Sequence, residues 1–250
     1  MYYPVVLWPA ALGLSVIGSL GGLVTAALLL LCRPAMRARV VPWLISYAVG
    51  TLLGAALLGL TPKALESLPP AQALGALLAG ILAFFVLEKL VLWRHCHEEG
   101  ECSVHHTTTT LVVVGDAVHT FVDGVVIAAA TLVSLPLGLT TAMAVAAHEI
   151  PQEAGDFAIL LAAGHSRSRA LVLNVASAAG GLLGATAMLL FGSLAPAALP
   201  YILAFAAGNF LYVAMTDLIP NLHRGHLDRN AVRQIVLIAL GVLTIIALPD

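Results

Sequence analysis

Charged residues are scarce in this chain. Only 10% of its 250 residues are Asp, Glu, Lys or Arg, and 60% are hydrophobic, whereas about 25% of residues in a soluble domain are charged. Residues 4–32, 42–62, 70–87 and 170–216 contain no charged side chain at all. About 20 consecutive apolar residues span a bilayer. This scarcity excludes an ordinary water-soluble domain and predicts an all-α, polytopic membrane protein.

Other features that the sequence lacks narrow the class of protein further. Three cysteines are too few for the disulfide framework of a small secreted fold. The chain has no Gly-x-x-x-x-Gly-Lys loop, so a P-loop ATPase within it is not expected. Residues 1–27 contain no Lys or Arg, unlike the basic start of a cleavable signal peptide, and we expect a retained first helix. The net charge of −2 gives no indication of a nucleic-acid partner.

Turn residues divide the chain into eight expected membrane-spanning helices within a single domain, residues 1–250. The expected helices are 5–32, 41–61, 71–93, 108–132, 138–163, 169–192, 199–219 and 231–248. Of the 11 Lys and Arg residues, all but Lys63 fall in alternate connections. The positive-inside rule therefore predicts that those connections are cytoplasmic and that both termini lie outside.

The fourth and fifth expected helices break the apolar pattern. Their polar residues are Asp116, His119 and Asp123 on one helix, and His148, Glu149, Glu153 and Asp156 on the other. Each ionised carboxylate at the bilayer centre costs roughly 2.5 to 3.5 kcal/mol, so five facing lipid would cost on the order of 12 to 17 kcal/mol. These side chains must therefore face a protein interior, water or a cation.

Helical spacing sorts these residues into faces. His119 and Asp123 are four residues apart, as are His148 and Gln152, and Glu149 and Glu153, so each pair shares one side of its helix. Imidazole and carboxylate donors together suit zinc and its first-row neighbours, whereas magnesium or calcium favours all-oxygen sites. The sequence therefore predicts a divalent-metal site between the two helices.

Several polar residues also have interpretations that involve no metal. Pro151 kinks the fifth helix and either opens space for an ion or has no part in binding. Asp116 and Asp156 are either ligands or capping and interhelix hydrogen-bond residues. For Asp217 we expect a boundary or packing role, and for Glu88 with Lys89 we expect side chains that reach to the interface from a helix end.

Two segments resemble the signature motifs of the ZIP family of divalent-metal transporters. Val118-His119-Thr120-Phe121-Val122-Asp123-Gly124 resembles the family's fourth-helix motif, His-Asn-x-x-Asp/Glu-Gly. His148-Glu149-Ile150-Pro151-Gln152-Glu153 resembles its fifth-helix motif, His-Glu-x-Pro-His-Glu. The segment 207–214 and Asp217 are similar to the family as well, so the resemblance covers essentially the whole chain.

The resemblance implies an eight-helix transporter that carries zinc, or iron, manganese or cadmium, into the cytoplasm, and that is not an enzyme. It implies a primary metal site of His119, Asp123, His148 and Gln152, with Glu149 and Glu153 beside it. It further implies homodimers, an elevator-like movement of one helix bundle and no cofactor other than the transported ion. We expect an integral protein of the plasma (inner) membrane.

The chain departs from the family pattern at three places. Thr120 replaces the usual asparagine, and Gln152 replaces a histidine or glutamate, which puts a second metal position in doubt. Residues 54–59 lack the aspartate and histidine that many relatives carry in the second helix. Because a neutral amide is a weaker ligand than imidazole or carboxylate, we expect a metal preference different from that of typical relatives.

The connection between the third and fourth helices, residues 94–107, is rich in His and Cys. Such tracts bind transition metals, but the spacing here matches no zinc-finger pattern. We interpret it as a flexible cytoplasmic loop that receives or senses metal, the alternative being a solvated polar loop.

Two other functions compete with transport. His148-Glu149 begins like the His-Glu-x-x-His motif of a metalloprotease, but Gln152 stands where the second histidine is required. A membrane sensor that binds metal without moving it is the other alternative, and the sequence alone does not separate it from a transporter.

Overall fold

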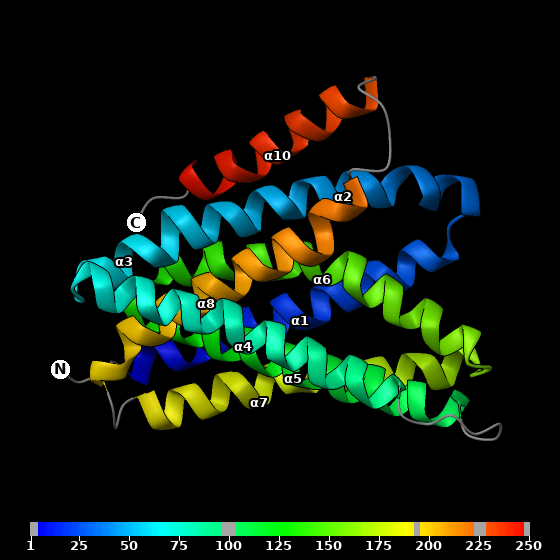
Figure 1. Ribbon diagram of the computed structural model, residues 1–250, viewed down its shortest axis with the longest axis horizontal. Helices are drawn as coiled ribbons and strands as arrows, with labels where there is room; N and C mark the ends of the chain where they lie inside the picture. The colour runs from blue at the N-terminus through cyan, green and yellow to red at the C-terminus, as the bar shows by residue number, and fades with distance from the viewer. Residues whose placement is uncertain (1–4, 97–103, 193–195, 223–228, 248–250) are drawn as a thin grey trace.

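The computed structural model describes residues 5–96, 104–192, 196–222 and 229–247, and these form helices joined by short connections (Figure 1). Two short 3-10 turns, Val5–Leu7 and Pro196–Ala198, precede α1 and α8. The helices are α1 (Trp8–Leu31), α2 (Pro34–Gly54), α3 (Thr61–Leu65), α4 (Pro70–Cys96), α5 (Val104–Val133), α6 (Leu135–Ala162), α7 (Arg167–Gly192), α8 (Leu199–Val213), α9 (Ile219–Leu222) and α10 (Arg229–Ala247). Two π-helical segments, η2 (Ala55–Leu60) and η4 (Ala214–Leu218), continue α2 into α3 and α8 into α9.

The described helices therefore follow eight paths, one for each helix expected from the sequence. Six of them are long and apolar enough to cross a membrane, and α10 contains a shorter apolar helix, Ala231–Ala247. The path along α6 carries Glu149, Glu153 and Asp156, which lower its hydropathy. The protein is thus an all-α, polytopic membrane protein, while the count of eight spans and the outside position of both termini stay predictions.

Two helices begin earlier than expected, close to a proline. The second helix was expected from residue 41 but begins at Pro34 and continues through Pro42. Proline is tolerated in the first turn of a helix, where its missing N–H would have no partner. At the other end of the bundle, Ser134 caps α6, since its hydroxyl accepts a hydrogen bond from the Leu137 N–H at 3.2 Å.

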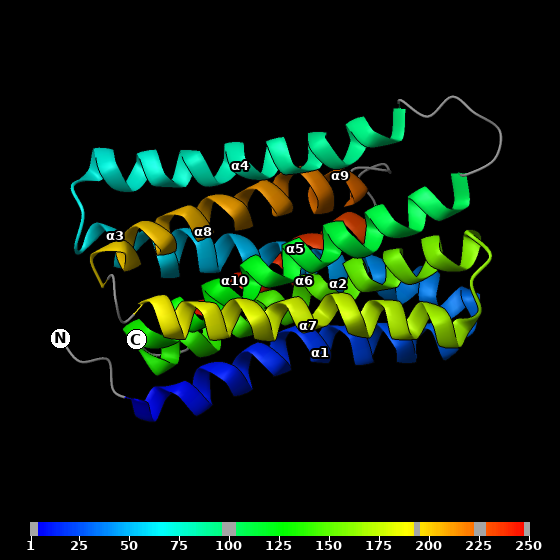
Figure 2. The same cartoon turned by 90° about the horizontal axis from the view of Figure 1, so that it is seen from below.

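The helices are arranged as two groups. One group contains α1, α5, α6 and α7, and the other contains α2, α4, α8 and α10 (Figures 1 and 2). Within the groups, α5 packs on α7, α4 on α8 and α2 on α10 at very short range. A Cβ added to Gly184 would lie 1.9 Å from the Phe121 carbonyl oxygen, and one added to Gly208 would lie 2.0 Å from that of Leu77. Small residues let membrane helices approach closely in this way.

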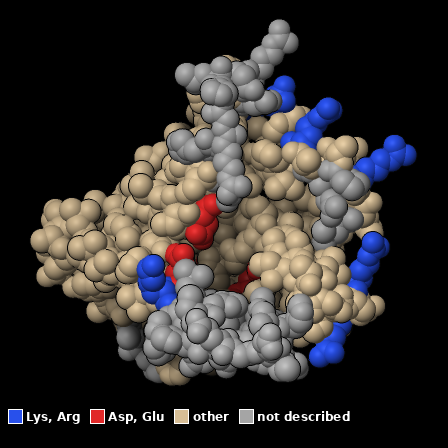
Figure 3. All heavy atoms as spheres, turned by 45° about the vertical axis from the view of Figure 1, so that its right-hand side comes forward, with Lys and Arg blue, Asp and Glu red and all other residues tan. Residues whose placement is uncertain are grey.

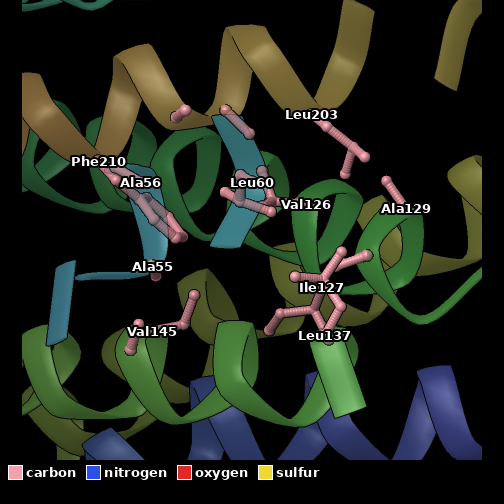
Figure 4. Packing of buried hydrophobic residues seen from close by; sticks show 14 of the residues in the cluster. Ala55, Ala56, Leu60, Val126, Ile127, Ala129, Leu137, Val145, Leu203 and Phe210 are labelled. Atoms are coloured by element: carbon pink, nitrogen blue, oxygen red, sulfur yellow. The ribbon is translucent and has the colours of Figure 1, made fainter. Parts of the chain in front are cut away.

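The groups meet along α2 and α6, and α8 also contacts α5. Buried apolar side chains from both groups fill part of this boundary (Figure 4). We call ten of them the apolar layer: Ala55, Ala56, Leu60, Val126, Ile127, Ala129, Leu137, Val145, Leu203 and Phe210. We refer to the end of the bundle at the α5–α6 connection as the Ser134 end, and to the end at the α6–α7 turn as the Gly164 end.

Candidate metal centre

Helices α5 and α6 bring four of the predicted metal ligands together. One donor atom from each of His119, Asp123, His148 and Glu149 lies within 4.8 Å of the others. The two imidazole Nε2 atoms are 3.1 Å apart. Asp123 Oδ2 lies 3.5 Å from Nε2 of His119 and 3.3 Å from Nε2 of His148. The i, i+4 spacing on each helix therefore produces the convergence expected from the sequence.

These separations match a tetrahedral metal site. Zinc binds nitrogen and oxygen at about 2.0 to 2.1 Å, and two ligands of a tetrahedral ion at that distance are about 3.3 Å apart. The three measured separations, 3.1, 3.3 and 3.5 Å, fall around this value. Neither oxygen of Asp123 makes a hydrogen bond within the described part of the chain. A cation between the three side chains would satisfy all of them at once.

The protonation of His148 is set by its own helix. Its Nδ1 lies 3.1 Å from the carbonyl oxygen of Ala144, and because a carbonyl can only accept, Nδ1 carries the proton. The lone pair of Nε2 is then free to face Asp123 and His119. A backbone partner of this kind is what normally orients a metal-binding histidine. The ring also packs against Phe210, with centroids 6.1 Å apart, and His119 packs against Phe84.

Burial separates this cluster from an ordinary polar patch. Asp123, Glu149 and Glu153 are 0% exposed and His148 is 1% exposed. Both carboxylate oxygens of Glu149 and of Glu153 lack a hydrogen-bond partner among the described residues. Buried carboxylates without hydrogen bonds are strongly unfavourable unless a proton or a cation compensates them.

A second group of acids adjoins the first. Oxygen atoms of Asp116, Glu149 and Glu153 also lie within 4.8 Å of one another, so Glu149 belongs to both groups. Helix α1 closes over this residue at Gly22, where an added Cβ would lie 2.4 Å from the Glu149 Cβ. The sequence allows two roles for Asp116, as a metal ligand or as a capping or interhelix hydrogen-bond residue. Its signal was its position, three residues before His119 and seven before Asp123 on one face of α5.

Gln152 and Thr120, the two departures in the motifs, have partners away from the first group. The Gln152 side-chain amide donates a hydrogen bond to Asp116 Oδ1 at 3.2 Å, which is the interhelix role considered for Asp116. The Thr120 hydroxyl donates to the Ser177 carbonyl oxygen of α7 at 2.9 Å. Thr120 therefore joins two helices, and Gln152 positions an acid of the second group in the metal-free protein.

A cavity of about 430 Å³ leads to this centre, and His119, His148, Pro151 and Gln152 line it. Acidic side chains lie inside a hollow at one end of the molecule, with Lys and Arg around its rim (Figure 3). The acids that line the cavity come from four helical paths: Glu88, Asp116, Asp156 and Asp217. The Tyr212 hydroxyl donates a hydrogen bond to Glu88.

For two of these acids, the sequence analysis predicts a role other than lining the cavity. Glu88 was expected to reach to the membrane interface, and Asp217 was expected to be a boundary or packing residue, but both line the cavity. No local signal indicates this, because the contacts join α4 to α8 across 124 residues of sequence. The His- and Cys-rich segment 94–107 lies largely outside the described residues, so its metal-binding role stays a prediction.

Long apolar helices with a buried histidine and carboxylate cluster at the end of a cavity define the class: a membrane protein with a candidate intramembrane site for a divalent metal ion. The family described as "ZIP Zinc transporter" matches residues 92–249, which is more than half of the chain. The chain belongs to this family. Because ZIP proteins are transporters, the metalloprotease alternative is not supported.

Named relatives agree with this assignment. The chain is 36% identical over 220 residues to zinc transporter ZIP13 of Pongo abelii, covering 81% of this chain and 65% of the relative. It is 34% identical over 248 residues to ZIP13 of Mus musculus, covering 82% of this chain and 69% of the relative. Over 110 residues it is 48% identical to zinc transporter ZIP4 of Mus musculus, covering 44% of this chain and 16% of that protein. The chain thus spans about two thirds of the ZIP13 relatives.

Proposed function

We propose that this protein transports zinc, or a related divalent transition-metal ion, across a membrane into the cytoplasm. The observation that carries the proposal is the buried convergence of His119, Asp123, His148 and Glu149 between α5 and α6. Its donor types and spacing suit zinc, and its position at the end of a cavity suits an ion that enters and leaves. The named relatives are zinc transporters.

The ion is held first by His119, Asp123 and His148, with Glu149 completing the shell. Glu153 and Asp116 adjoin this shell through Glu149 and offer a second position. Gln152 reaches the ion only if it releases Asp116, to which it is hydrogen-bonded. Iron, manganese and cadmium are alternative cargoes, because the same donors bind them as well.

The proposed direction follows from the charges at the two ends. The cavity reaches Asp156 and Asp217, toward the Gly164 end, where Arg33, Arg167, Arg169 and Arg233 begin helices or precede them. The positive-inside rule makes this end cytoplasmic, and we propose the plasma (inner) membrane. An inside-negative potential then favours entry of a divalent cation by about 4.6 kcal/mol per 100 mV, twice the value for one charge.

Movement of the ion requires that the site open to the Ser134 end as well. We propose that the group α1, α5, α6 and α7 moves against the group α2, α4, α8 and α10 while carrying the site. The close packing at Gly184 and Gly208 lies within groups, which supports movement between the groups rather than inside them. Alternating access of this kind is general for secondary transporters.

The test is uptake by purified protein in proteoliposomes loaded with a fluorescent zinc chelator. Saturable zinc uptake by the wild type, lost in His119→Ala and in Asp123→Ala, is the expected result. His165→Ala, in the α6–α7 turn, is the matched histidine control and is expected to transport normally. Tight zinc binding without uptake by the wild type would contradict transport and favour a sensor. Normal uptake by His119→Ala and Asp123→Ala would contradict the site.

A further inference from the structure

Asn209 is a buried amide with no hydrogen-bond partner within the described part of the chain. The side chain is 0% exposed, and neither its Nδ2 nor its Oδ1 is hydrogen-bonded. Two other fully buried polar side chains, Thr131 and Thr141, bond to their own helices. Thr131 donates to the Ile127 carbonyl oxygen at 2.7 Å, and Thr141 donates to that of Leu137 at 2.7 Å. Asn209 is different because a buried amide without partners is unfavourable and native proteins rarely keep one.

The position of Asn209 in α8 is set by its neighbours. The next residue, Phe210, belongs to the apolar layer and packs its ring against His148. Val213, one turn further toward the Gly164 end, lines the cavity, as does Asp217. Asn209 does not line the cavity. It lies one helical turn from Val213, in the direction of the Ser134 end. The amide therefore lies beside the apolar layer, which an ion must cross to reach the metal centre from that end.

The Cα atom of Gly208 packs directly against the Leu77 carbonyl oxygen of α4. The side of α8 that carries Gly208 therefore faces α4. Successive helical residues are separated by about 100°, so Asn209 lies to one side of that contact. The residue one turn later on the same side of α8 is Val213, which lines the cavity. Both observations place Asn209 on the side of α8 that borders the ion path, continuing the line of cavity residues into the apolar layer.

We propose that Asn209 is a polar positioning residue for the incoming ion, an inference that rests on the proposed transport function. When the site opens toward the Ser134 end, the Asn209 carbonyl oxygen accepts a hydrogen bond from the water shell of a divalent cation or binds the cation directly. Amide oxygens accept hydrogen bonds from water and are ligands of hard divalent ions such as calcium. The ion then passes one turn along α8 to His148 and His119. In the described conformation the apolar layer is closed.

The test compares Asn209→Leu, Asn209→Ala and Asn209→Ser with the wild type in proteoliposomes. We expect Asn209→Leu, which keeps the volume and removes the polar atoms, to lower the initial rate of zinc uptake at least tenfold. Asn209→Ala is expected to be similarly slow, and Asn209→Ser, which keeps an oxygen, is expected to recover most of the rate. Zinc affinity of the detergent-solubilised proteins, measured by competition with a chelator, is expected to stay within twofold, since His119, Asp123 and His148 are unchanged.

A purely structural role predicts the opposite pattern. Asn209→Leu would then transport at the wild-type rate, which would overturn the inference, as would equal slowing by Leu and Ser. Thr141→Val, which removes a buried hydroxyl already bonded to its own helix, is the matched control and is expected to transport normally. If Asn209→Leu fails to fold, the Ala and Ser variants decide the question. Absence of uptake by the wild type would instead refute the transport function itself, so the two failures are distinguishable.

Discussion

At the residue scale, the metal centre depends on the pairing of two imidazoles with buried carboxylates. His148 supplies one nitrogen, fixed by the Ala144 carbonyl oxygen at 3.1 Å, and Asp123 faces both rings. His148 is thus held by its own helix before any ion arrives. Such pre-organisation lowers the cost of ordering the ligands when the metal binds.

The first prediction concerns His148. Loss of even an outer partner of a metal ligand lowers affinity about 10- to 100-fold, so His148→Ala is expected to lower zinc affinity at least about 100-fold. Competition with a chromophoric chelator in detergent measures this. His165→Ala, in the turn between α6 and α7, provides the control and is expected to bind as the wild type does. Equal affinities for the wild type and His148→Ala would show that the ion binds elsewhere.

The second prediction separates two roles of Gln152. Its amide donates to Asp116, and a carboxylate cannot donate, so Gln152→Glu leaves Asp116 without this bond and adds a second negative charge. The metal-free protein is expected to lose about 1 to 3 kcal/mol of stability. Bound zinc is expected to restore part of it, and the zinc-induced increase in Tm should therefore exceed that of the wild type.

Gln72→Glu is the matched control for this substitution. Gln72 accepts a hydrogen bond from the Tyr201 hydroxyl at 2.6 Å through Oε1, and glutamate can still accept it. Its Tm is expected to stay close to that of the wild type, with or without zinc. A metal-free Gln152→Glu protein as stable as the wild type would mean that the Asp116 contact contributes little.

At the scale of the elements, glycine decides how closely the helices pack. The hydrophobic effect does not drive helices together within lipid, so close backbone packing and interhelical hydrogen bonds must do so. Two of the tightest approaches, at Gly184 between α7 and α5 and at Gly208 between α8 and α4, lie within a helix group. The buried hydrogen bonds from Ser15 to the Gly181 carbonyl oxygen and from Thr120 to that of Ser177 also lie within one group.

The third prediction uses two glycines with opposite surroundings. In Gly184→Ala the new Cβ would meet the Phe121 carbonyl oxygen at 1.9 Å, whereas Gly75→Ala meets nothing within 4 Å. Gly184→Ala is therefore expected to cost about 1 to 3 kcal/mol, and Gly75→Ala is expected to gain about 0.5 to 1 kcal/mol from its helix propensity. Thermal unfolding in detergent measures both. Changes of the same sign and size would contradict the close packing of α5 and α7.

At the scale of the whole molecule, the two helix groups meet at a boundary that is apolar in one part and opens into the cavity in another. The apolar layer closes the path at the Ser134 end, while acids from both groups line the cavity. The described conformation is thus closed on one side of the metal centre. Transport requires at least one other conformation in which the groups have shifted.

The fourth prediction tests that shift by cross-linking. An added Cβ at Gly59 would lie 3.4 Å from Cδ1 of Leu137 in the other group, and one at Gly54 would lie 3.2 Å from Cβ of Ile245 in its own group, so each pair suits a reducible bifunctional cross-linker. In a background without native cysteines, cross-linked Gly59→Cys with Leu137→Cys is expected to lose uptake and to regain it on reduction. Cross-linked Gly54→Cys with Ile245→Cys, one turn away on the same path, is expected to transport normally. Equal uptake by both cross-linked proteins would contradict movement between the groups.

Much of this architecture could be predicted from the sequence because its causes are local. A membrane helix must satisfy its own backbone and present apolar side chains to lipid, so uncharged stretches identify the helices directly. The i, i+4 rule likewise placed His119 with Asp123 on one face. Pro136 was less informative, because it was expected to mark a turn but lies in the first turn of α6.

The sequence by itself thus determined the helices and the chemical nature of the centre. Only the tertiary structure decided the partners: Gln152 with Asp116, Thr120 with the α7 backbone, and Tyr212 with Glu88. Only the structure, too, places Asn209 beside the apolar layer, buried and without a hydrogen-bond partner among the described residues. The physical reason is the separation in sequence over which each kind of interaction acts. Helix formation and facial periodicity depend on residues within a few positions, whereas these contacts depend on how helices far apart in sequence pack together.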